Sequence, residues 1–389
     1  MNCRMTRRRV LSALGATAAG TLLNPLRARA AEDPPDLPVS PVAITRCTTY
    51  GDGLEAAVAG LFDLLGGVED LVRDKTVAIK VNLVADPYGR LQDLPLELTH
   101  WTHPAVIRAA VALLGRAGAA RIRVLECCGD LNMSFADYVR EAGWDPDWIL
   151  GAAPNVELQN TNGPGTDYAR FWCPNGGLVF PGYDLHSSYA DCDVMVSIPK
   201  MKEHHWFGVT LSMKNGYGMT PLTIYGSGAD TDAPSLTVPQ GNRTSVFHAG
   251  TRPPSLTAPQ ELDPDSPRIG GYRLPRIIAE INSARPFHLA IIDGIETMAG
   301  GEGPWYEEAR PVKPGVLLAG FNAVNTDAVA MAVMGFDPMA GQGQTPFDDP
   351  DCENFLSFAA QLGLGSRDLS AIPVLGTSIE DARFDFRSA

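Results

Sequence analysis

Residues 76–82 are TVAIKVN, residues 102–118 are THPAVIRAAVALLGRAG, and residues 121–126 are RIRVLE. The first and third segments are short apolar runs typical of buried strands. In the second, apolar residues recur with helical spacing, Thr102 can cap the helix, Pro104 suits the first turn, and Gly118 ends it. A helix of this length between two strands favours a parallel strand pair.

The same alternation continues on both sides of this unit. Further strands are expected at residues 42–48, 193–198, 287–293, 316–320 and 372–376. Further helices are expected at residues 54–65, with Asp52 as a possible cap, and at residues 134–142, 274–284, 324–334 and 353–362. The pattern predicts an α/β fold with a mostly parallel sheet covered by helices on both faces.

A single α/β domain is expected over residues 41–389. Within it, residues 222–268 form a long insertion rich in Pro, Ser, Thr and Gly. Irregular segments of this length usually form a lid, a binding surface or a disordered loop. No later stretch approaches the length of a stable membrane span.

The first 30 residues have the order of a cleavable twin-arginine signal peptide. Arg7-Arg8 is followed by an apolar run over residues 11–23 and by Ala28-Arg29-Ala30, which predicts cleavage after Ala30. The alternative is an ordinary amphipathic helix. Residues 31–40 are expected to be a disordered leader. The twin-arginine export machinery is therefore an expected partner, and the expected location is periplasmic or secreted.

The charge of the chain limits its partners. The net charge is −14, and removal of residues 1–30, which hold six arginines and no acid, would make it −20. Such a protein repels the phosphates of nucleic acids at long range, so no nucleic-acid partner is expected. Any cluster of basic side chains stands out against this background.

Cysteine spacing identifies no cofactor. The chain has seven cysteines, including Cys3 in the signal segment, but no C-x-x-C pair. The usual spacings of zinc and iron–sulfur sites are therefore absent. Cys192 lies beside a predicted buried strand and is expected to be a buried thiol.

Polar side chains follow four of the predicted strands. Lys80 and Asn82 end one strand, Glu126 ends another, Lys200 follows a third, and Asp293 ends a fourth. In parallel sheets, ligands bind beyond the carboxyl ends of the strands. Lys80 would be costly to bury alone, so it should emerge from the sheet or pair with an acid.

The densest group of reactive side chains lies between residues 197 and 218. Lys200, Lys202 and Lys214 indicate an anion site, and His204 and His205 could transfer protons or bind a metal. Adjacent histidines in a strand face opposite ways, so at most one should enter a given pocket. Helical spacing would place Phe207, Thr210, Lys214 and Tyr217 on one face. The alternative is a solvated basic loop with one packed histidine.

These residues carry a resemblance to a known family. Pro199-Lys200-x-Lys202-x-His204, then Val209-Thr210-Leu211, Lys214-Asn215 and Gly218, resemble the signature of domain-of-unknown-function family 362. Other segments with matching motifs are residues 79–82, 102–104, 293–304 and 325–336. The resemblance covers residues 75–338 and implies no specific reaction. Some members carry a Cys-rich ferredoxin-like module, whose cysteines this chain lacks.

The first hypothesis is an exported enzyme that acts on a small anionic ligand. Its ligand-binding residues would be Lys80, Asn82, Lys200, Lys214 and Asn215, and its catalytic residues His204 and Lys202. Asp293 and His205 would bind a divalent metal if one is present. Asp293 could instead form a turn, and Glu302 is expected to be a solvated loop acid. His103 is expected to lie at a helix start, and Asp327 is expected to cap a helix.

The second hypothesis is a periplasmic protein that binds a ligand or cofactor without turnover. The same lysines would then hold the ligand permanently. The third is a structural domain in which the lysines only neutralise nearby acids.

Overall fold

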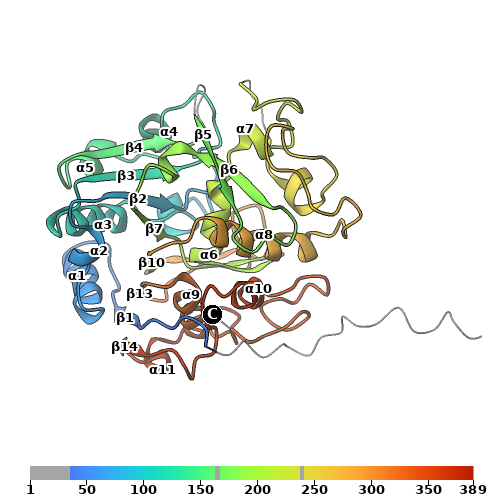
Figure 1. Ribbon diagram of the computed structural model, residues 1–389. Helices are drawn as coiled ribbons and strands as arrows, with labels where there is room; N and C mark the ends of the chain where they lie inside the picture. Colours follow the sequence, from blue (N-terminus) through green and yellow to red (C-terminus); the bar gives the residue numbers. More distant parts are fainter. Residues whose placement is uncertain (1–35, 163–166, 237–240, 389) are drawn as a thin grey trace, which may run out of the picture. The chain divides into compact units, whose positions relative to one another are not determined.

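The computed structural model describes residues 36–162, 167–236 and 241–388 (Figure 1). The predicted signal peptide, residues 1–30, and residues 31–35 of the predicted leader lie outside these residues.

The described residues form one eight-stranded sheet in the order β14-β1-β13-β10-β7-β2-β3-β4, which can be followed from strand to strand in Figure 1. Its strands are β1 (Val42–Arg46), β2 (Thr76–Val81), β3 (Arg121–Glu126), β4 (Val156–Asn160), β7 (Val194–Ile198), β10 (Leu289–Gly294), β13 (Val316–Gly320) and β14 (Val374–Gly376). Only β13 runs against its neighbours β1 and β10 in this sheet, and the other pairs are parallel. The prediction of a mostly parallel sheet is confirmed.

Helices cover both faces of the sheet, as the α/β pattern predicts. One side carries α1 (Leu54–Leu64), α2 (Glu69–Val72), α3 (Pro104–Arg116), α4 (Phe135–Glu141) and α5 (Pro146–Leu150). The other carries α6 (Ser212–Gly216), α8 (Gly270–Ala284), α9 (Ala323–Val333) and α10 (Phe355–Gln361). In Figure 1, α1–α3 lie on one side of the strands and α6, α8, α9 and α10 lie on the other.

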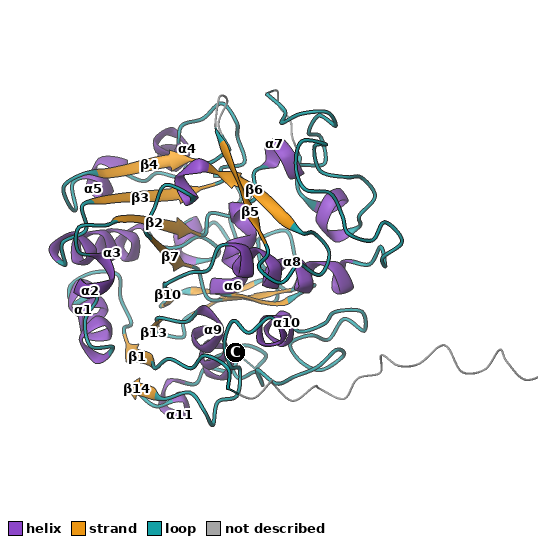
Figure 2. Cartoon of the chain, in the orientation of Figure 1, coloured by secondary structure: helices purple, strands orange, loops and turns teal. Residues whose placement is uncertain are grey.

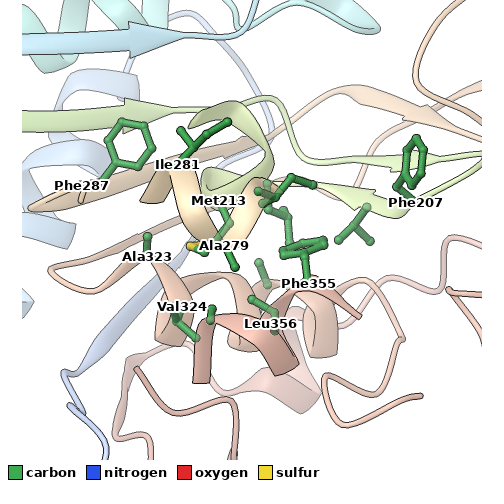
Figure 3. Packing of buried hydrophobic residues seen from close by; sticks show 14 of the residues in the cluster. Phe207, Met213, Ala279, Ile281, Phe287, Ala323, Val324, Phe355 and Leu356 are labelled. Atoms are coloured by element: carbon green, nitrogen blue, oxygen red, sulfur yellow. The ribbon is translucent and has the colours of Figure 1, made fainter. Parts of the chain in front are cut away.

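Side-chain alternation along the strands divides the core into two layers. In β13, Leu317 packs in the layer with α1 and α3, whereas Val316 and Leu318 pack in the layer with α8, α9 and α10. Figure 3 shows the second layer, where Met213 of α6, Ile281 of α8 and residues of α9 and α10 pack together. Strands buried on both faces are mostly apolar, so the buried charged side chains of Lys80 in β2, Glu126 in β3 and Asp293 in β10 stand out.

Shorter elements lie outside the main sheet. They are the pairs β5 (Tyr168–Trp172) with β6 (Gly182–His186), β8 (Lys202–His204) with β9 (Gly208–Thr210), and β11 (Thr297–Ala299) with β12 (Arg310–Val312), the helices α7 (Leu222–Tyr225) and α11 (Ile379–Ala382), and the short turns η1 (Leu96–Leu98), η2 (Ser187–Tyr189) and η3 (Tyr217–Met219). Figure 2 shows α7 near β6 and α11 near β14.

The insertion at residues 222–268 packs against the core rather than standing apart. Its described part contains α7 and the single π-helical turn η4 (Thr244–His248), and otherwise consists of loops. Val246 and Phe247 are buried and belong to the core layer of α8. The segment therefore forms part of the wall around the site described below.

Two predicted helix caps differ in the structure. The N-cap of α3 is His103, whose Nδ1 accepts the Ala105 N–H at 3.1 Å, while the Thr102 hydroxyl donates to the Ile198 carbonyl at 2.6 Å. The N-cap of α1 is Gly53, in a left-handed conformation with φ 91°, so Asp52 does not cap this helix. Among the described residues, all six cysteines, including Cys192, are buried free thiols.

Candidate functional site

The polar side chains at the strand ends meet as two buried ion pairs. Strand order places β2 beside β3 and β7 beside β10. Lys80 Nζ lies 2.7 Å from Glu126 Oε1, and Lys200 Nζ lies 2.7 Å from Asp293 Oδ2. The rule that polar groups gather at the carboxyl edge holds, but each lysine already has an acidic partner there.

Lys80 is held in place from several directions. Besides Glu126, its ammonium donates to the Asn215 side-chain oxygen at 3.2 Å. Asn215 in turn donates to the Lys80 carbonyl and to Ser197 Oγ, both at 3.0 Å. Glu126 also accepts the N–H groups of Leu83 and Cys127. The expectation that Lys80 pairs with an acid is confirmed, and Asn215 orients this pair.

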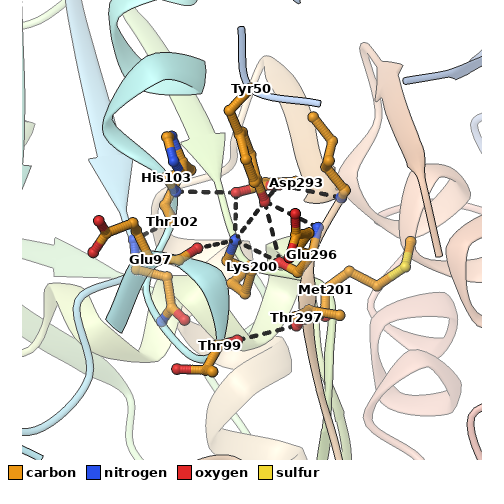
Figure 4. Close-up of polar contacts among 12 residues, drawn as sticks. Tyr50, Glu97, Thr99, Thr102, His103, Lys200, Met201, Asp293, Glu296 and Thr297 are labelled. Atoms are coloured by element: carbon orange, nitrogen blue, oxygen red, sulfur yellow. Dashed lines mark hydrogen bonds and ion pairs between the residues drawn. The ribbon is translucent and has the colours of Figure 1, made fainter. Parts of the chain in front are cut away.

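Lys200 and Asp293 form the centre of a second network (Figure 4). The Lys200 ammonium donates to Tyr50 Oη at 3.0 Å, to the Glu97 carbonyl at 2.7 Å and to the Glu296 carbonyl at 2.9 Å. Asp293 accepts the Tyr50 hydroxyl at 2.9 Å and the His103 N–H at 3.0 Å. Burial lowers the pKa of Lys200, and the neighbouring Asp293 opposes this shift.

This network does not fit the roles predicted for Lys200 and Asp293. An ammonium has three protons, and the internal oxygens around Lys200 already use them all. Asp293 is fully buried and neutralised by Lys200. We therefore assign both residues to holding β7, β10 and the start of α3 together.

A cavity of about 1110 Å³ opens on the Lys80 side of the sheet edge. Its walls come from the loops after β2 and β3, the β8–β9 hairpin, α6, residues 241–248 and residues 302–306. Lys80, Asn82, Lys202, His204, Lys214 and Asn215 line it, whereas Lys200, His205 and Asp293 do not. Six of the nine predicted site residues are thus brought together around one space large enough for a small molecule.

Lys214 is the cation in this cavity without a partner. Its side chain is nearly buried, and its Nζ makes no ion pair or hydrogen bond with any residue that the structure describes. The ammonium lies 4.5 Å from the centre of the Tyr217 ring and 6.0 Å from that of Phe207, which are cation–π contacts. Burial lowers the pKa of Lys214 to about 8, and Glu302 partly opposes this shift.

Lys202 connects two loops beneath the cavity. Its ammonium donates to the His100 carbonyl at 2.9 Å and to the Glu302 carbonyl at 3.1 Å. Burial lowers the pKa of Lys202 to about 7, opposed by the charge of Glu302. Lys202 therefore positions the loop that carries Glu302.

His204 and Glu302 form a potential proton-transfer pair. His204 Nδ1 lies 3.4 Å from Glu302 Oε2 and is buried without a hydrogen-bond partner among the described residues. Burial is the main reason that the pKa of His204 is well below its usual value, and nearby Lys214 adds to the effect. The imidazole is thus neutral at physiological pH, with one ring nitrogen as a donor and the other as an acceptor.

Glu302 is not the solvated loop acid that the sequence predicts. Only 13% of its side chain is exposed, and it accepts the His205 N–H at 3.2 Å and the Tyr306 hydroxyl at 3.0 Å. The Gly-rich segment around it folds over the β8–β9 hairpin instead of extending into water. Its position beside two glycines hid this contact from sequence reasoning.

The two adjacent histidines separate as predicted. His204 lines the cavity, whereas His205 is exposed and stacks on Tyr306 with 4.6 Å between ring centres. Within residues 36–162, 167–236 and 241–388, no group of three or more His, Cys, Asp or Glu side chains is arranged to hold a metal ion. His205 and Asp293 contact different partners, so they do not form a common metal site.

The segment around Lys214 differs from the predicted continuous helix. Gly208, with φ 78°, allows the chain to turn into β9, and a Cβ there would lie 2.6 Å from the Phe347 ring. α6 begins only at Ser212, where Asp327 accepts the N–H groups of Ser212 and Met213 at 2.8 and 2.7 Å. Asp327 is thus a cap, but of α6 rather than of its own helix. Phe207, Thr210, Lys214 and Tyr217 still face the same cavity.

Several lining residues were not singled out from the sequence. Arg243 donates to the Thr220 carbonyl at 2.8 Å, and His248 Nε2 lies 3.3 Å from Tyr217 Oη. Asn82, which was singled out, has a side-chain oxygen that is buried without a partner among the described residues. Arg243 and His248 belong to the insertion, and nothing in its composition indicates that it would reach this cavity.

Comparison with known proteins agrees with the resemblance seen in the motifs. The sequence profile of DUF362, a domain of unknown function, matches residues 77–332. This chain belongs to the DUF362 family. The cavity-lining residues Lys80, Lys202, His204 and Lys214 all lie within the DUF362 region. No curated protein matches the sequence.

Two solved structures are similar to this DUF362 protein. The lactate racemase apoprotein of Thermoanaerobacterium thermosaccharolyticum matches with 10% identity and a TM-score of 0.33, over 70% of this chain and 54% of the other. A protein of Thermotoga maritima matches with 12% identity and a TM-score of 0.29, over 69% of this chain and 55% of the other. The alignments span about half the length of each of those proteins. Across the described ranges, no helix has the length and apolar composition that crossing a membrane requires.

Proposed function

We propose that the cavity binds a small anionic ligand and that Lys214 holds its negatively charged group. The observation that carries this proposal is the unpaired ammonium of Lys214. Lys80 is neutralised by Glu126, and the Lys202 ammonium is held by hydrogen bonds to two carbonyl oxygens, whereas Lys214 has neither an ion pair nor a hydrogen bond among the described residues. A buried charge without a counter-ion is unfavourable, and an incoming anion would supply one.

The surroundings of Lys214 favour a carboxylate or a phosphate as this group. A lysine ammonium is a compact charge with three donors, which suits either anion. The aromatic rings of Tyr217 and Phe207 lie beside the ammonium but cannot neutralise it. The proposal also accounts for an accessible buried cation in a chain whose net charge is −14.

Calorimetric titration of the full chain with acetate and with inorganic phosphate tests this proposal. Lys214→Met should weaken binding of the preferred anion at least about tenfold, since a hydrogen bond to a charged group contributes about 1.5–3 kcal/mol. Lys313→Met is the matched control, because that lysine side chain is 74% exposed. Affinity should also fall as the pH rises through about 8, where Lys214 loses its proton. Binding of both anions that survives in Lys214→Met contradicts the proposal.

A second candidate function is proton transfer to or from the bound ligand. It is favoured by the neutral His204 imidazole that faces Glu302 at 3.4 Å inside the same cavity. Lys202 would act by positioning Glu302 rather than by touching the ligand. The other candidate is a binding protein without turnover.

Ligand that remains bound after native purification separates these candidates. An enzyme of this kind should exchange a ligand hydrogen with deuterium from the solvent, and His204→Gln should abolish the exchange while binding persists. If the ligand exchanges the same hydrogens with the wild-type protein as it does alone in solvent, the non-catalytic function is favoured.

We also propose that residues 1–30 direct twin-arginine export, which would place the folded protein in the periplasm or outside the cell. Support comes from the order of Arg7-Arg8, the apolar run and the Ala28-Arg29-Ala30 cleavage pattern. Replacing both arginines with lysine should leave uncleaved protein in the cytoplasmic fraction of the native host. Cleaved, exported protein from this variant would contradict the proposal.

A further inference from the structure

Large aromatic side chains are exposed around the cavity. Trp206 is 51% exposed, Trp305 is 50% exposed and Tyr88 is 61% exposed, and all three line the cavity. Aromatic rings left half in water are available to contact a ligand that enters the cavity.

Two further rings, His205 and Tyr306, connect Trp206 with Trp305, and we call these four residues the aromatic row. Trp206, Tyr306 and Trp305 line the cavity, whereas His205 does not. The centres of neighbouring rings lie 5.2 Å apart for Trp206 and His205, 4.6 Å for His205 and Tyr306, and 6.3 Å for Tyr306 and Trp305. The planes of these neighbouring rings meet at 79°, 22° and 51°, so the row consists of adjoining rings whose faces point in different directions.

A series of contacts connects the aromatic row to Lys214. The Tyr306 hydroxyl donates to Glu302 at 3.0 Å, and Glu302 faces His204 at 3.4 Å. The His204 ring lies 5.0 Å from the Phe207 ring, over which the Lys214 ammonium is placed at 6.0 Å. One molecule in the cavity can thus meet ring surfaces at one end and the unpaired ammonium at the other.

We infer that the ligand carries a flat aromatic ring in addition to its anionic group, so that the ring stacks on a ring of the aromatic row while the anion reaches Lys214. This inference rests on the proposed function and deepens it. Stacking on exposed indoles covers apolar surface and adds a geometric preference for flat rings. The cavity volume of about 1110 Å³ accommodates both parts of such a ligand.

The test compares benzoate with cyclohexanecarboxylate by calorimetric titration of the full chain. Both probes carry one carboxylate and a six-carbon ring, but only the benzoate ring is flat. Wild-type protein should bind benzoate about tenfold more tightly, which corresponds to about 1.4 kcal/mol. Trp305→Ala and Trp206→Ala should each reduce this preference severalfold.

Two exposed tryptophans elsewhere provide matched controls. Trp148 and Trp172 are 44% and 57% exposed, do not line the cavity, and lie beside Arg108 and Arg170. Trp148→Ala and Trp172→Ala should leave the preference for benzoate unchanged. Circular dichroism melting of all four variants checks that each one folds.

Gly303→Ala offers a second route to the same result without deleting a ring. A Cβ at residue 303 would lie 2.1 Å from the nearest atom of the Trp305 indole, so the indole must move. The preference for benzoate should fall as in Trp305→Ala.

The outcomes distinguish this inference from the proposed function. Equal affinity for both probes, with both lost in Lys214→Met, overturns the aromatic ring and leaves the anion site standing. A preference for benzoate that survives in Trp305→Ala, Trp206→Ala and Gly303→Ala also overturns the ring inference. The ring inference is likewise overturned if glucuronate, which has a sugar ring, binds more tightly than benzoate. If neither a carboxylate nor inorganic phosphate binds, both the ring inference and the proposed function fail.

Discussion

Replacing Lys214 with Met should stabilise the protein while removing anion binding. Burial lowers the pKa of Lys214 from 10.5 to about 8 in the folded protein. This shift corresponds to an unfavourable contribution of about 3 kcal/mol near pH 7, since each pKa unit is about 1.36 kcal/mol. Met fills a similar volume without a charge, so it relieves this contribution and keeps the packing against Phe207 and Tyr217.

The effect should depend on pH in a defined direction. Between about pH 8 and pH 10.5 the unfolded chain still binds the Lys214 proton while the folded protein has released it, so wild-type stability rises with pH there. The advantage of Lys214→Met should therefore shrink from about 3 kcal/mol near pH 7 to about 1 kcal/mol near pH 9.5.

Urea unfolding followed by circular dichroism at these two pH values measures the difference. Lys313→Met serves as the control, because an exposed lysine should change the free energy of unfolding by less than about 0.5 kcal/mol. The reasoning is refuted if Lys214→Met is less stable than the wild type near pH 7. It is also refuted if the difference between the two proteins does not change with pH.

Two further changes test how the site is supported. Lys200→Met should lower the free energy of unfolding by about 3–5 kcal/mol, because it leaves the buried Asp293 carboxylate without a counter-ion. In urea unfolding, a double variant that also carries Asp293→Asn should lose less free energy of unfolding than the sum of the two single changes. Asp327→Ala should lower the free energy of unfolding by at least about 2 kcal/mol, because it leaves the N–H groups of Ser212 and Met213 without an acceptor. Calorimetry should also show weaker anion binding, because α6 carries Lys214. Unchanged binding would show that this cap does not position Lys214.

Much of the secondary structure could be predicted from local patterns. The strands at residues 121–126 and 316–320 have the predicted bounds, and most helix ends agree within two residues. α8 begins at Gly270, four residues before the predicted start, and the Gly271 carbonyl in its first turn accepts the N–H of Glu353, which is distant in sequence. The turn at Gly208 was missed because its requirement for a glycine comes from Phe347, which is distant in sequence.

The candidate site could be predicted only in outline. Sequence reasoning identified lysines and acids at strand ends, but it did not identify which acid pairs with which lysine. It also assigned the same role to Lys80, Lys200 and Lys214, although two of them form ion pairs and the third does not. Glu302 and the insertion residues Arg243 and His248 enter the cavity through folding alone.

The amino-acid sequence by itself determined the family, the α/β class and the placement of polar residues at strand ends, because apolar periodicity and turn residues act over short stretches of chain. Tertiary structure decided that β2 lies beside β3 and β7 beside β10, and hence which lysine charges are neutralised. Strand order depends on packing between segments far apart in sequence, which no local pattern encodes. For this reason the unpaired ammonium of Lys214 became evident only in the folded protein.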